Sequence, residues 1–504
     1  MRAPKLCVTV TADTLAELRE RRDRVVEADL VELRIDGVRD ANAAGALAGR
    51  RLPVIFTCRP TWEGGQFTGS EEERKRLLQD AQQLGADYID IEMRAGFDDL
   101  ISSSGGRGIV LSTHHFDGVP SDLACRTRAM RATGAEVVKV AVMANRLTDC
   151  LALKPLVKDQ TVPTVVLAMG AAGSPSRVLA GRFGSCWTYA GDGIAPGQIP
   201  ASELCDRYSF RSIGHRTTLY GVVGRPIAHS ISPALHNAAF RASGIDAVYL
   251  PLAAADFEDF LAFADAMCIQ GASVTAPFKL DAFESAVEAD AVSRRINAVN
   301  TLKRRAGAWV GCNTDVAGVL APLQSATPLR DARVTVLGAG GAARAVAEAL
   351  GSVGAKLTIC ARRLEQAEQV ARATGAEIGR CPPPAGSWDI LVNTTPIGMR
   401  PRDDESPLPD GPFTGSLVYD LVYNPPETRL LRDAQAAGCR TIGGLEMLIA
   451  QAQRQFEWWT GLRVSSRLMR QAAMAALGGR GETLHGVREP RERAAPGTER
   501  RGHV

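Results

Sequence analysis

The chain has 504 residues, more than one hydrophobic core of typical size would cover, so we expect several domains. Apolar residues make up 45% and charged residues 23%, a composition typical of globular proteins that excludes disordered, collagen-like and membrane classes. The formal net charge is +3, which gives no basis for a nucleic-acid or acidic-membrane partner. Eight of the 59 basic residues are lysines, so the position of each lysine is informative.

Eleven cysteines are scattered through apolar stretches and form no Cys-x-x-Cys pair. This pattern is typical of buried thiols in a reducing compartment. The first twelve residues lack the apolar centre of a signal peptide, and no run approaches 18 apolar residues. We therefore predict a cytoplasmic protein without a membrane partner.

Short β-branched runs recur eight times before residue 190, and amphipathic segments such as 71–85 and 121–134 separate most of them. This α/β arithmetic predicts an N-terminal (β/α)8 barrel over 1–214, with its chemistry at the carboxyl ends of the strands. A doubly wound sheet is the alternative that spacing alone leaves open. The strand-like runs are LCVTV at 6, DLVELRI at 29, PVIFTC at 53, YIDIEM at 88, GIVLSTH at 108, VVKVAVM at 137, TVVLAMG at 164 and GSCWTYA at 184.

A second α/β pattern begins near Leu219, where a strand-like run precedes a helix that starts at Ser232-Pro233. A hairpin is predicted over 298–312 and a helix from Thr314. From 333 onward, RVTVLGAGGAARAVAEALGSVG predicts a strand, a Gly-rich turn and a helix. After Gly478 the apolar periodicity ends, so we expect 479–504 to be a disordered tail.

Lys139 lies in VVKVAVM, an otherwise apolar strand, where the cost of burying an ammonium favours the neutral, nucleophilic amine that a Schiff base requires. His114 follows the preceding strand, so its imidazole should reach the same rim as a proton carrier. Each residue taken singly also has an ordinary structural explanation. Lys139 could reach solvent or pair with a carboxylate, and His114 could be a structural histidine. The neighbouring strand ends add charged groups that suit a carbonyl acid substrate, namely Glu32, Arg34, Arg59, Glu63 and Arg177.

Residues 5–212 resemble type I 3-dehydroquinate dehydratase. The resemblance is carried by VELRID, FTCRPTWEGG, LSTHHF, VVKVAVM, MGAAGSPSR and APGQI, in this order. It implies that Lys139 forms an imine with the C3 ketone and that His114 removes the C2 proton and assists water loss. It also implies that Glu63 orients His114.

The same resemblance implies a substrate site around the imine. Arg177 would clamp the substrate carboxylate, and the hydroxyls and anionic face would be held by Glu32, Arg34, Arg59 and Gln198. One departure is Ile194, which stands where the family commonly has Ser and removes a hydroxyl contact.

A G-x-G-x-x-A turn between a strand and a helix predicts a dinucleotide site, because its glycines let the backbone approach a pyrophosphate at a helix N-terminus. Its residues are Gly338, Gly340, Gly341, Ala342 and Ala343. The next strand, KLTIC, is followed closely by Arg362 and Arg363, and two guanidiniums favour the 2′-phosphate of NADP over the ribose hydroxyl of NAD. A structural Gly turn with exposed arginines is the alternative.

Residues 217–478 resemble shikimate dehydrogenase. The matching stretches are GRPIAHSISPALHN, VTAPFK, AVNT, GCNTD, NTTPIGM, YDLVYNPPETRLL and GGLEMLIAQAQRQF. The resemblance implies a substrate-binding domain over 217–325 and an NADP-binding Rossmann domain over 326–478, whose C-terminal helices return to the substrate site.

Within that resemblance, Lys279 and Asp315 are the dyad that delivers a proton to the C3 carbonyl oxygen as hydride arrives from NADPH. The implied substrate ligands are Ser230 and Ser232 for the carboxylate, and Thr275, Asn300, Gln451 and Tyr423 around the ring. Further implied cofactor contacts are Thr395, Met399 and Gly444. Two departures from the family pattern are Ser273, where it has Asn, and Ala361-Arg362-Arg363, where it has Asn-Arg-Thr.

Together the two resemblances imply a bifunctional enzyme of the shikimate pathway with small-molecule substrates, NADP(H), a covalent imine at Lys139 and no metal. It would convert 3-dehydroquinate to 3-dehydroshikimate and then to shikimate. The oligomeric state stays open. One alternative is a second domain that prefers quinate and NAD, and another is a ligand-sensing regulator. The intact pairs at Lys139 and Lys279 argue against the regulator, as does the lack of a DNA-binding motif.

Overall fold

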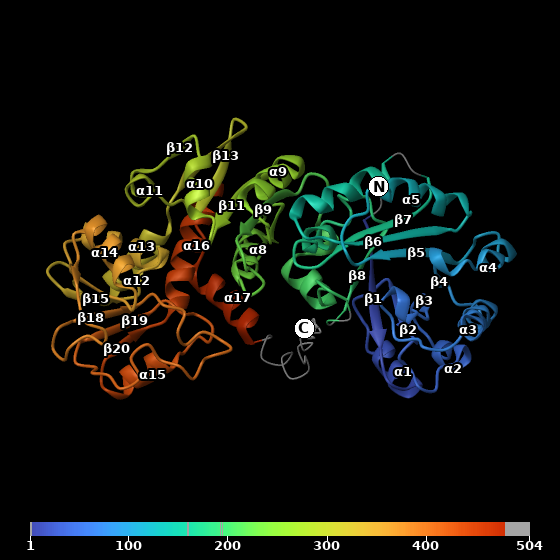
Figure 1. Cartoon of the computed structure of the whole chain (residues 1–504), viewed down its shortest axis with the longest axis horizontal. Helices are drawn as coiled ribbons and strands as arrows, with labels where there is room; N and C mark the ends of the chain where they lie inside the picture. Colours follow the sequence, from blue (N-terminus) through green and yellow to red (C-terminus); the bar gives the residue numbers. More distant parts are fainter. Residues whose placement is uncertain (1–2, 159–160, 192, 194, 479–504) are drawn as a thin grey trace, which may run out of the picture.

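The computed structural model describes residues 3–158, 161–191, 193 and 195–478. The predicted tail at 479–504 and the departure at Ile194 lie outside these residues. Three sheets follow one another along the chain, and they lie in a row along the long axis of the molecule (Figure 1). No helix within the described ranges has the length and apolar character needed to cross a membrane.

The first sheet is the predicted barrel, with eight parallel strands in the order β7-β6-β5-β4-β3-β2-β1-β8. A backbone hydrogen bond of 3.0 Å from Cys186 N to Thr164 O joins the two ends of this order, so the sheet curls back on itself. The barrel prediction is confirmed. The strands are β1 (Lys5–Thr11), β2 (Leu30–Arg34), β3 (Val54–Thr57), β4 (Tyr88–Glu92), β5 (Ile109–His115), β6 (Val137–Met143), β7 (Thr164–Met169) and β8 (Trp187–Ala190).

Helices connect the barrel strands. The predicted helix at 71–85 is α3 (Glu71–Gln83), which begins with a capping box between Ser70 and Glu73, a pattern that satisfies two of the unpaired N–H groups of the first turn. The other regular segments are α1 (Leu15–Asp23), α2 (Ala43–Leu47), η1 (Thr61–Glu63), η2 (Met93–Ala95), α4 (Asp98–Ser103), α5 (Leu123–Ala132), η3 (Leu147–Leu153), α6 (Lys154–Val157), α7 (Ser174–Val178), η4 (Glu203–Arg207) and η5 (Phe210–Ser212).

The second sheet is mixed and has the order β10-β9-β11-β13-β14-β12. Two of its strand pairs are antiparallel, β11 with β13 and β13 with β14, and the second is the hairpin that the sequence predicts at 298–312. The strands are β9 (Thr218–Val223), β10 (Ala247–Leu252), β11 (Ile269–Val274), β12 (Glu288–Ala289), β13 (Thr301–Arg305) and β14 (Ala308–Cys312). Its helices are α8 (Ser232–Ala242), α9 (Phe257–Met267), α10 (Lys279–Ser285) and α11 (Ala291–Ile296).

The third sheet is parallel, and its order β17-β16-β15-β18-β19-β20 is the 3-2-1-4-5-6 order of a Rossmann fold, in which ligands bind where the order reverses. The strands are β15 (Arg333–Leu337), β16 (Lys356–Cys360), β17 (Glu377–Ile378), β18 (Ile390–Asn393), β19 (Leu417–Asp420) and β20 (Arg440–Ile442). Its helices are α12 (Asp315–Ala326), α13 (Gly341–Ser352), α14 (Leu364–Thr374) and α15 (Arg429–Ala436).

The last two helices return to the second sheet. Helix α16 (Gly444–Thr460) packs against α12 and α8, and α17 (Ser466–Gly478) packs against α8. Their apolar residues form one buried cluster with residues of β9, β10 and α8. Figure 1 shows both helices, in red, beside the green elements of the second sheet.

Asp259 joins the barrel to the second sheet. Its buried carboxylate on α9 accepts hydrogen bonds from Leu147 N at 2.9 Å and from Thr148 N at 2.9 Å, both in η3 of the barrel. It also accepts from the Thr148 hydroxyl at 2.8 Å and from Ala255 N at 3.0 Å. A single cluster of buried apolar residues continues from the barrel into α9 and β9–β11. The barrel and the second sheet therefore share an apolar core, and the buried Asp259 carboxylate links them by hydrogen bonds.

We predict that Asp259→Ala lowers the free energy of unfolding by about 2–3 kcal/mol, because it leaves buried N–H donors unpaired. Activities of both parts should be lost at the same reduced urea concentration, which is the measurement. Glu258→Gln, an exposed position on the same helix, is the matched control and should change stability by less than about 0.5 kcal/mol. An unchanged urea midpoint for Asp259→Ala would contradict this role.

Candidate active sites

A cavity of about 110 Å³ opens within the barrel. It is lined by the eight barrel residues that the sequence predicts, which are Glu32, Arg34, Arg59, Glu63, His114, Lys139, Arg177 and Gln198. They come from β2, β5 and β6, from η1 and α7, and from the segments after β3 and β8. The parallel strands bring these residues together because their carboxyl ends meet at one rim.

The amine of Lys139 is buried among carboxylates. Its Nζ donates to Glu32 Oε1 at 3.2 Å and to Asp90 Oδ2 at 3.1 Å, and it lies 4.2 Å from the centre of the Tyr189 ring. The strand itself is apolar, but the fold supplies two carboxylates and an aromatic ring around the amine. These contacts hold Nζ in the cavity that His114 also lines.

His114 is paired with Glu63. Its Nδ1 lies 2.9 Å from Glu63 Oε1, which also accepts from the backbone N–H of His114 at 3.0 Å. Burial raises the pKa of Glu63 to about 7. Burial and the neighbouring Arg59 guanidinium hold the pKa of His114 well below its usual range. The imidazole is therefore neutral near pH 7, with its proton on Nδ1 and a free lone pair on Nε2.

Arg177 is almost fully buried on α7, and its guanidinium donates to the backbone carbonyls of Tyr189 and Pro196, each at 3.4 Å. Its Nε has no hydrogen-bond partner in the described part of the chain, and burial lowers the pKa of Arg177 to about 10. A buried guanidinium with an unused donor is well suited to a substrate carboxylate.

Two other predicted ligands make contacts inside the protein. Arg34 forms a two-bond pair with Asp36, at 2.7 and 2.8 Å. Gln198 donates to the Thr9 hydroxyl at 3.3 Å and accepts from Ala195 N at 3.0 Å. Both side chains still line the cavity.

The second predicted centre lies between α10 and α12. Lys279 Nζ, at the first residue of α10, donates to Asp315 Oδ2 at 2.6 Å, and Asp315 is the first residue of α12. The other oxygen of this carboxylate accepts from Asn300 Nδ2 at 2.7 Å. Lys279 is about one-quarter exposed and Asp315 is buried, so the pair combines a fixed carboxylate with an accessible ammonium.

The other predicted substrate ligands of this half make contacts at the start of α8, in the segment after β11, and between α12 and α16. Thr275 lies against Gly224, where an added Cβ would come within 2.3 Å of the threonine methyl, and Gln451 on α16 lies against Gly318 of α12. The hydroxyl of Ser230 accepts from Ser232 N at 3.3 Å, at the start of α8. The ring of Tyr423 packs against the apolar cluster that α8 and α16 share.

The predicted dinucleotide turn joins β15 to α13. Gly338 has a φ of +108°, and a Cβ there would lie 2.6 Å from the Thr394 hydroxyl, so this position requires glycine. At Gly340 and Gly341 an added Cβ would meet no atom within 4 Å, which leaves an open cradle before the N-terminus of α13. A pyrophosphate fits such a cradle, because the free N–H groups of the helix point into it.

The other predicted cofactor residues lie at different places in the part of the chain that contains the third sheet. Arg362 and Arg363 are exposed just after β16, next to the turn, and Ala343 is buried under it. Ala342 is half-buried, and Thr395 is tied by its hydroxyl to Asn393 at 2.7 Å. Met399 is 47% exposed, and Gly444 begins α16 close to the carbonyl of Leu421. The described residues contain no group of three His, Cys, Asp or Glu side chains placed to hold a metal ion.

Comparison with known proteins identifies the family. A model described as type I 3-dehydroquinase matches residues 6–215. Models of the shikimate dehydrogenase substrate binding domain and of the shikimate 5′-dehydrogenase C-terminal domain match 222–302 and 444–474. A chloroplastic bifunctional 3-dehydroquinate dehydratase/shikimate dehydrogenase of Arabidopsis thaliana is 36% identical over 502 residues, which cover 92% of this chain and 83% of that protein. The chain belongs to this bifunctional family.

Single-function relatives match about half of this bifunctional chain. A shikimate dehydrogenase (NADP(+)) of Archaeoglobus fulgidus is 40% identical over 267 residues, which cover 51% of this chain and 98% of that protein. A crystal structure of a shikimate dehydrogenase in complex with NADP+ has a TM-score of 0.50 and 33% identity, covering 53% of this chain and 97% of that one.

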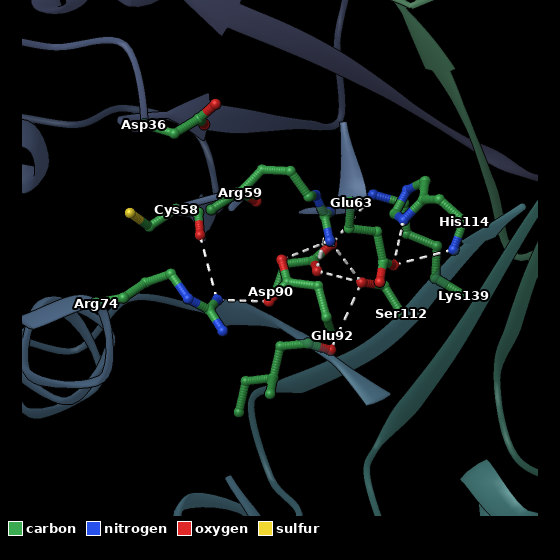
Figure 2. A network of polar contacts seen from close by, with 12 residues as sticks. Asp36, Cys58, Arg59, Glu63, Arg74, Asp90, Glu92, Ser112, His114 and Lys139 are labelled. Atoms are coloured by element: carbon green, nitrogen blue, oxygen red, sulfur yellow. Dashed lines mark hydrogen bonds and ion pairs between the residues drawn. The ribbon is translucent and has the colours of Figure 1, made fainter. Parts of the chain in front are cut away.

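The structure adds barrel residues that the sequence reasoning missed. Figure 2 shows Arg59 between two carboxylates, with Nη2 at 3.0 Å from Asp90 Oδ1 and Nη1 at 2.7 Å from Glu92 Oε1. Arg74 of α3 binds the other oxygen of Glu92 at 2.5 Å. Although burial acts in the opposite direction, Arg59 and Lys139 hold the pKa of Asp90 well below its usual range. The missed signal was YIDIE, which places two carboxylates on one face of a buried strand.

We predict that Arg74→Met destabilises the protein by about 3–5 kcal/mol, because it leaves Glu92 buried with a single cation. Urea unfolding measures the loss. Arg76→Met, on the exposed side of the same helix, is the matched control and should have little effect. A loss below about 1 kcal/mol for Arg74→Met would show that Arg59 alone satisfies both carboxylates.

Proposed function

We propose that this chain dehydrates 3-dehydroquinate to 3-dehydroshikimate in its barrel and reduces that product to shikimate with NADPH in its second half. The observation that carries the proposal is that one chain holds two complete sets of reactive groups, Lys139 with His114 and Lys279 with Asp315. The proposed units are 1–214 for the barrel, 217–325 for substrate binding and 326–478 for NADP.

In the proposed dehydration, Lys139 attacks the C3 ketone, and loss of water gives a protonated imine. The imine draws electrons from the neighbouring carbon, which makes the C2 proton acidic. His114 takes that proton on Nε2, and the resulting imidazolium, stabilised by Glu63, returns it to the departing C1 hydroxyl. Hydrolysis of the imine then releases the product and the amine.

The proposed substrate contacts follow from charge. The unused donor of Arg177, which lines the same cavity as Lys139, supports a bond to the substrate carboxylate. Hydroxyls would be held by the polar groups that line the same cavity, which are Glu32, Arg34, Arg59 and Gln198.

In the proposed reduction, the ammonium of Lys279 donates a proton to the C3 carbonyl oxygen as negative charge develops on it. Asp315 holds the ammonium in place by its 2.6 Å bond. Ser230 and Ser232, at the start of α8, would bind the substrate carboxylate, and Thr275, Gln451 and Tyr423 would contact the ring.

Bound NADPH supplies the hydride for this step. We propose that Gly340 and Gly341, where the turn is open, would hold its pyrophosphate and that Arg362 and Arg363 would hold its 2′-phosphate. Gly338, Ala342 and Ala343 would shape the turn, and Thr395, Met399 and Gly444 would lie nearer the nicotinamide.

We also propose that the protein acts on small molecules in the cytoplasm. This is supported by its eleven free thiols, which suit a reducing compartment.

Two lysine variants test the assignment of the two steps. Lys139→Ala should abolish the borohydride-trapped adduct with 3-dehydroquinate, detected by mass spectrometry, yet retain reduction of supplied 3-dehydroshikimate. Lys279→Ala should keep the adduct and lower the kcat of reduction by about 10²- to 10⁴-fold, because proton donation is removed. Lys356→Ala, whose side chain is 69% exposed in the parent, is the matched control.

Loss of both activities in either variant would overturn the separation of the two centres. Equal use of NADH and NADPH by the parent would overturn the proposed role of the two arginines.

The pH dependence tests the His114–Glu63 pair. Because the pKa of Glu63 is about 7, its carboxylate forms as the pH rises from about 6 to 8, and kcat/KM for dehydration should rise through the same range. The Glu63→Gln side chain cannot ionise, so the rise of kcat/KM between about pH 6 and 8, the acid limb of the pH profile, should disappear, and kcat should fall by about 10-fold or more. Steady-state rates between pH 5 and 9 give the measurement, and an unchanged limb in the variant would assign it to another group.

A further inference from the structure

A continuous chain of buried hydrogen bonds runs from the core of the second sheet to the Lys279–Asp315 pair. It crosses α8, β10, β11, α16 and β13 before it reaches α12. Its members are all buried, and they are His236, Tyr249, Ser273, Gln455, Thr301, Asn300 and Asp315. Apart from Asn300 and Asp315, none of them belongs to the site described above.

The carboxylate at one end determines the direction of every bond. The Asp315 carboxylate accepts from Lys279 Nζ through one oxygen and from Asn300 Nδ2 at 2.7 Å through the other, so the Asn300 amide nitrogen faces Asp315. Asn300 Oδ1 then faces the other way and accepts from Thr314 N at 2.7 Å and from the Thr301 hydroxyl at 2.8 Å. The Thr301 hydroxyl also lies 3.1 Å from the Thr314 hydroxyl, and whether its single hydrogen goes to Asn300 or to Thr314, that hydrogen is used on this side of the chain of bonds.

The direction continues through Gln455. Because the Thr301 oxygen can now only accept here, Gln455 must present its Nε2, at 3.1 Å. Its Oε1 then accepts from the Ser273 hydroxyl at 2.9 Å and from His236 Nε2 at 3.2 Å. Ser273 in turn accepts from the Tyr249 hydroxyl at 2.6 Å. The serine that replaces the family's Asn is thus a full member of the chain.

The far end of the chain agrees with this direction. If His236 donates from Nε2, its Nδ1 must be unprotonated and needs no acceptor. Nδ1 is buried without a hydrogen-bond partner among the described residues, and burial lowers the pKa of His236 to about 3, which keeps the ring neutral. Every donor and acceptor along the chain is therefore consistent with one orientation.

All hydrogen-bond donors and acceptors of the Asn300 side chain are used within the protein, so none is left for a substrate. Its Oδ1 holds two donors, and its Nδ2 hydrogens go to Asp315 and to the Thr314 hydroxyl at 3.0 Å. Asn300 therefore acts on the carboxylate, not on the ring hydroxyls to which the sequence assigned it.

We propose that Thr301 and Gln455 are positioning residues for the reduction step, which hold the Asn300 amide so that it orients the Asp315 carboxylate toward Lys279. This inference rests on the proposed dehydrogenase activity. Removing the Thr301 hydroxyl takes away one donor to the amide oxygen and leaves only the contacts with Thr314, so the amide and the carboxylate it holds gain freedom to rotate. A shift of the proton donor by an ångström or less is enough to slow proton transfer.

Paired substitutions at Thr301 separate this role from packing. Thr301→Val keeps the volume but removes the hydroxyl, and Thr301→Ser keeps the hydroxyl but loses a methyl group. We expect Thr301→Val to lower the kcat of shikimate formation about 10- to 100-fold, with the KM for 3-dehydroshikimate changed less than twofold, and Thr301→Ser to retain most of the parent kcat. Dehydratase activity of the same molecule reports intact folding, and Thr335→Val is a control at a buried strand threonine outside the chain of bonds.

A double-variant cycle tests the connection to α16. Gln455→Met should lower kcat in the same way, and Thr301→Val combined with Gln455→Met should be no slower than the worse single variant, because both remove one shared interaction. The control is Gln453→Met on the same helix, whose parent side chain donates to Val464 O in the segment between α16 and α17.

Three results would overturn the inference. These are a Thr301→Ser variant as slow as Thr301→Val, additive losses in the double variant, or a rise in KM without a fall in kcat, which would return Asn300 to substrate binding. Absence of any dehydrogenase activity in the parent would instead refute the proposed function on which the inference rests.

Discussion

A charge removed from water must meet opposite charges or several hydrogen-bond donors, because burying it alone costs more than the whole net stability of a domain. Both candidate centres of this protein obey that requirement. Lys139 is held by Glu32 and Asp90, and Asp315 by Lys279 and Asn300. Each reactive group is therefore the inner member of a network whose outer members decide how it points.

The two networks solve the problem differently. In the barrel, alternating charges extend outward from Lys139 through Asp90, Arg59 and Glu92 to Arg74. With Glu32 on the other side of Lys139, three cations face three carboxylates. In the dehydrogenase half, the Asp315 carboxylate is paired with Lys279 through one oxygen and with the neutral amide of Asn300 through the other, and neutral hydrogen bonds behind Asn300 orient that amide. Attraction between opposite charges orients the side chains around Lys139, and the direction of successive hydrogen bonds orients those behind Asp315.

The same requirement joins the two halves. The buried carboxylate of Asp259 in α9 accepts hydrogen bonds from N–H groups of the barrel segment η3. Arg182 of the barrel donates to backbone carbonyls at the junction, those of Gly214, His215 and Thr217. Around these polar contacts the apolar core is continuous. The relation between the two centres is thus set by packing, not by a linker alone.

Sequence reasoning was accurate where a local pattern carries the information. The eight strand runs, the capped helix α3, the hairpin and the glycine turn follow from hydrophobic period, caps and φ preferences within a few residues. The sequence did not predict that Asp90 pairs with Lys139 and Arg59, because a carboxylate in a short apolar strand does not show which side chain it will contact. It also gave Lys139 an apolar surrounding, whereas the fold supplies two carboxylates.

The sequence by itself determined the family, the order of the elements and the residue types at the strand ends, since these depend on motif spacing along one dimension. Only the tertiary structure decided the partners. Asp90 meets Lys139 across 49 residues, and Gln455 meets Thr301 across 154. Such pairs depend on strand order, register and helix packing, which bring distant segments within hydrogen-bond distance and determine which group donates and which accepts.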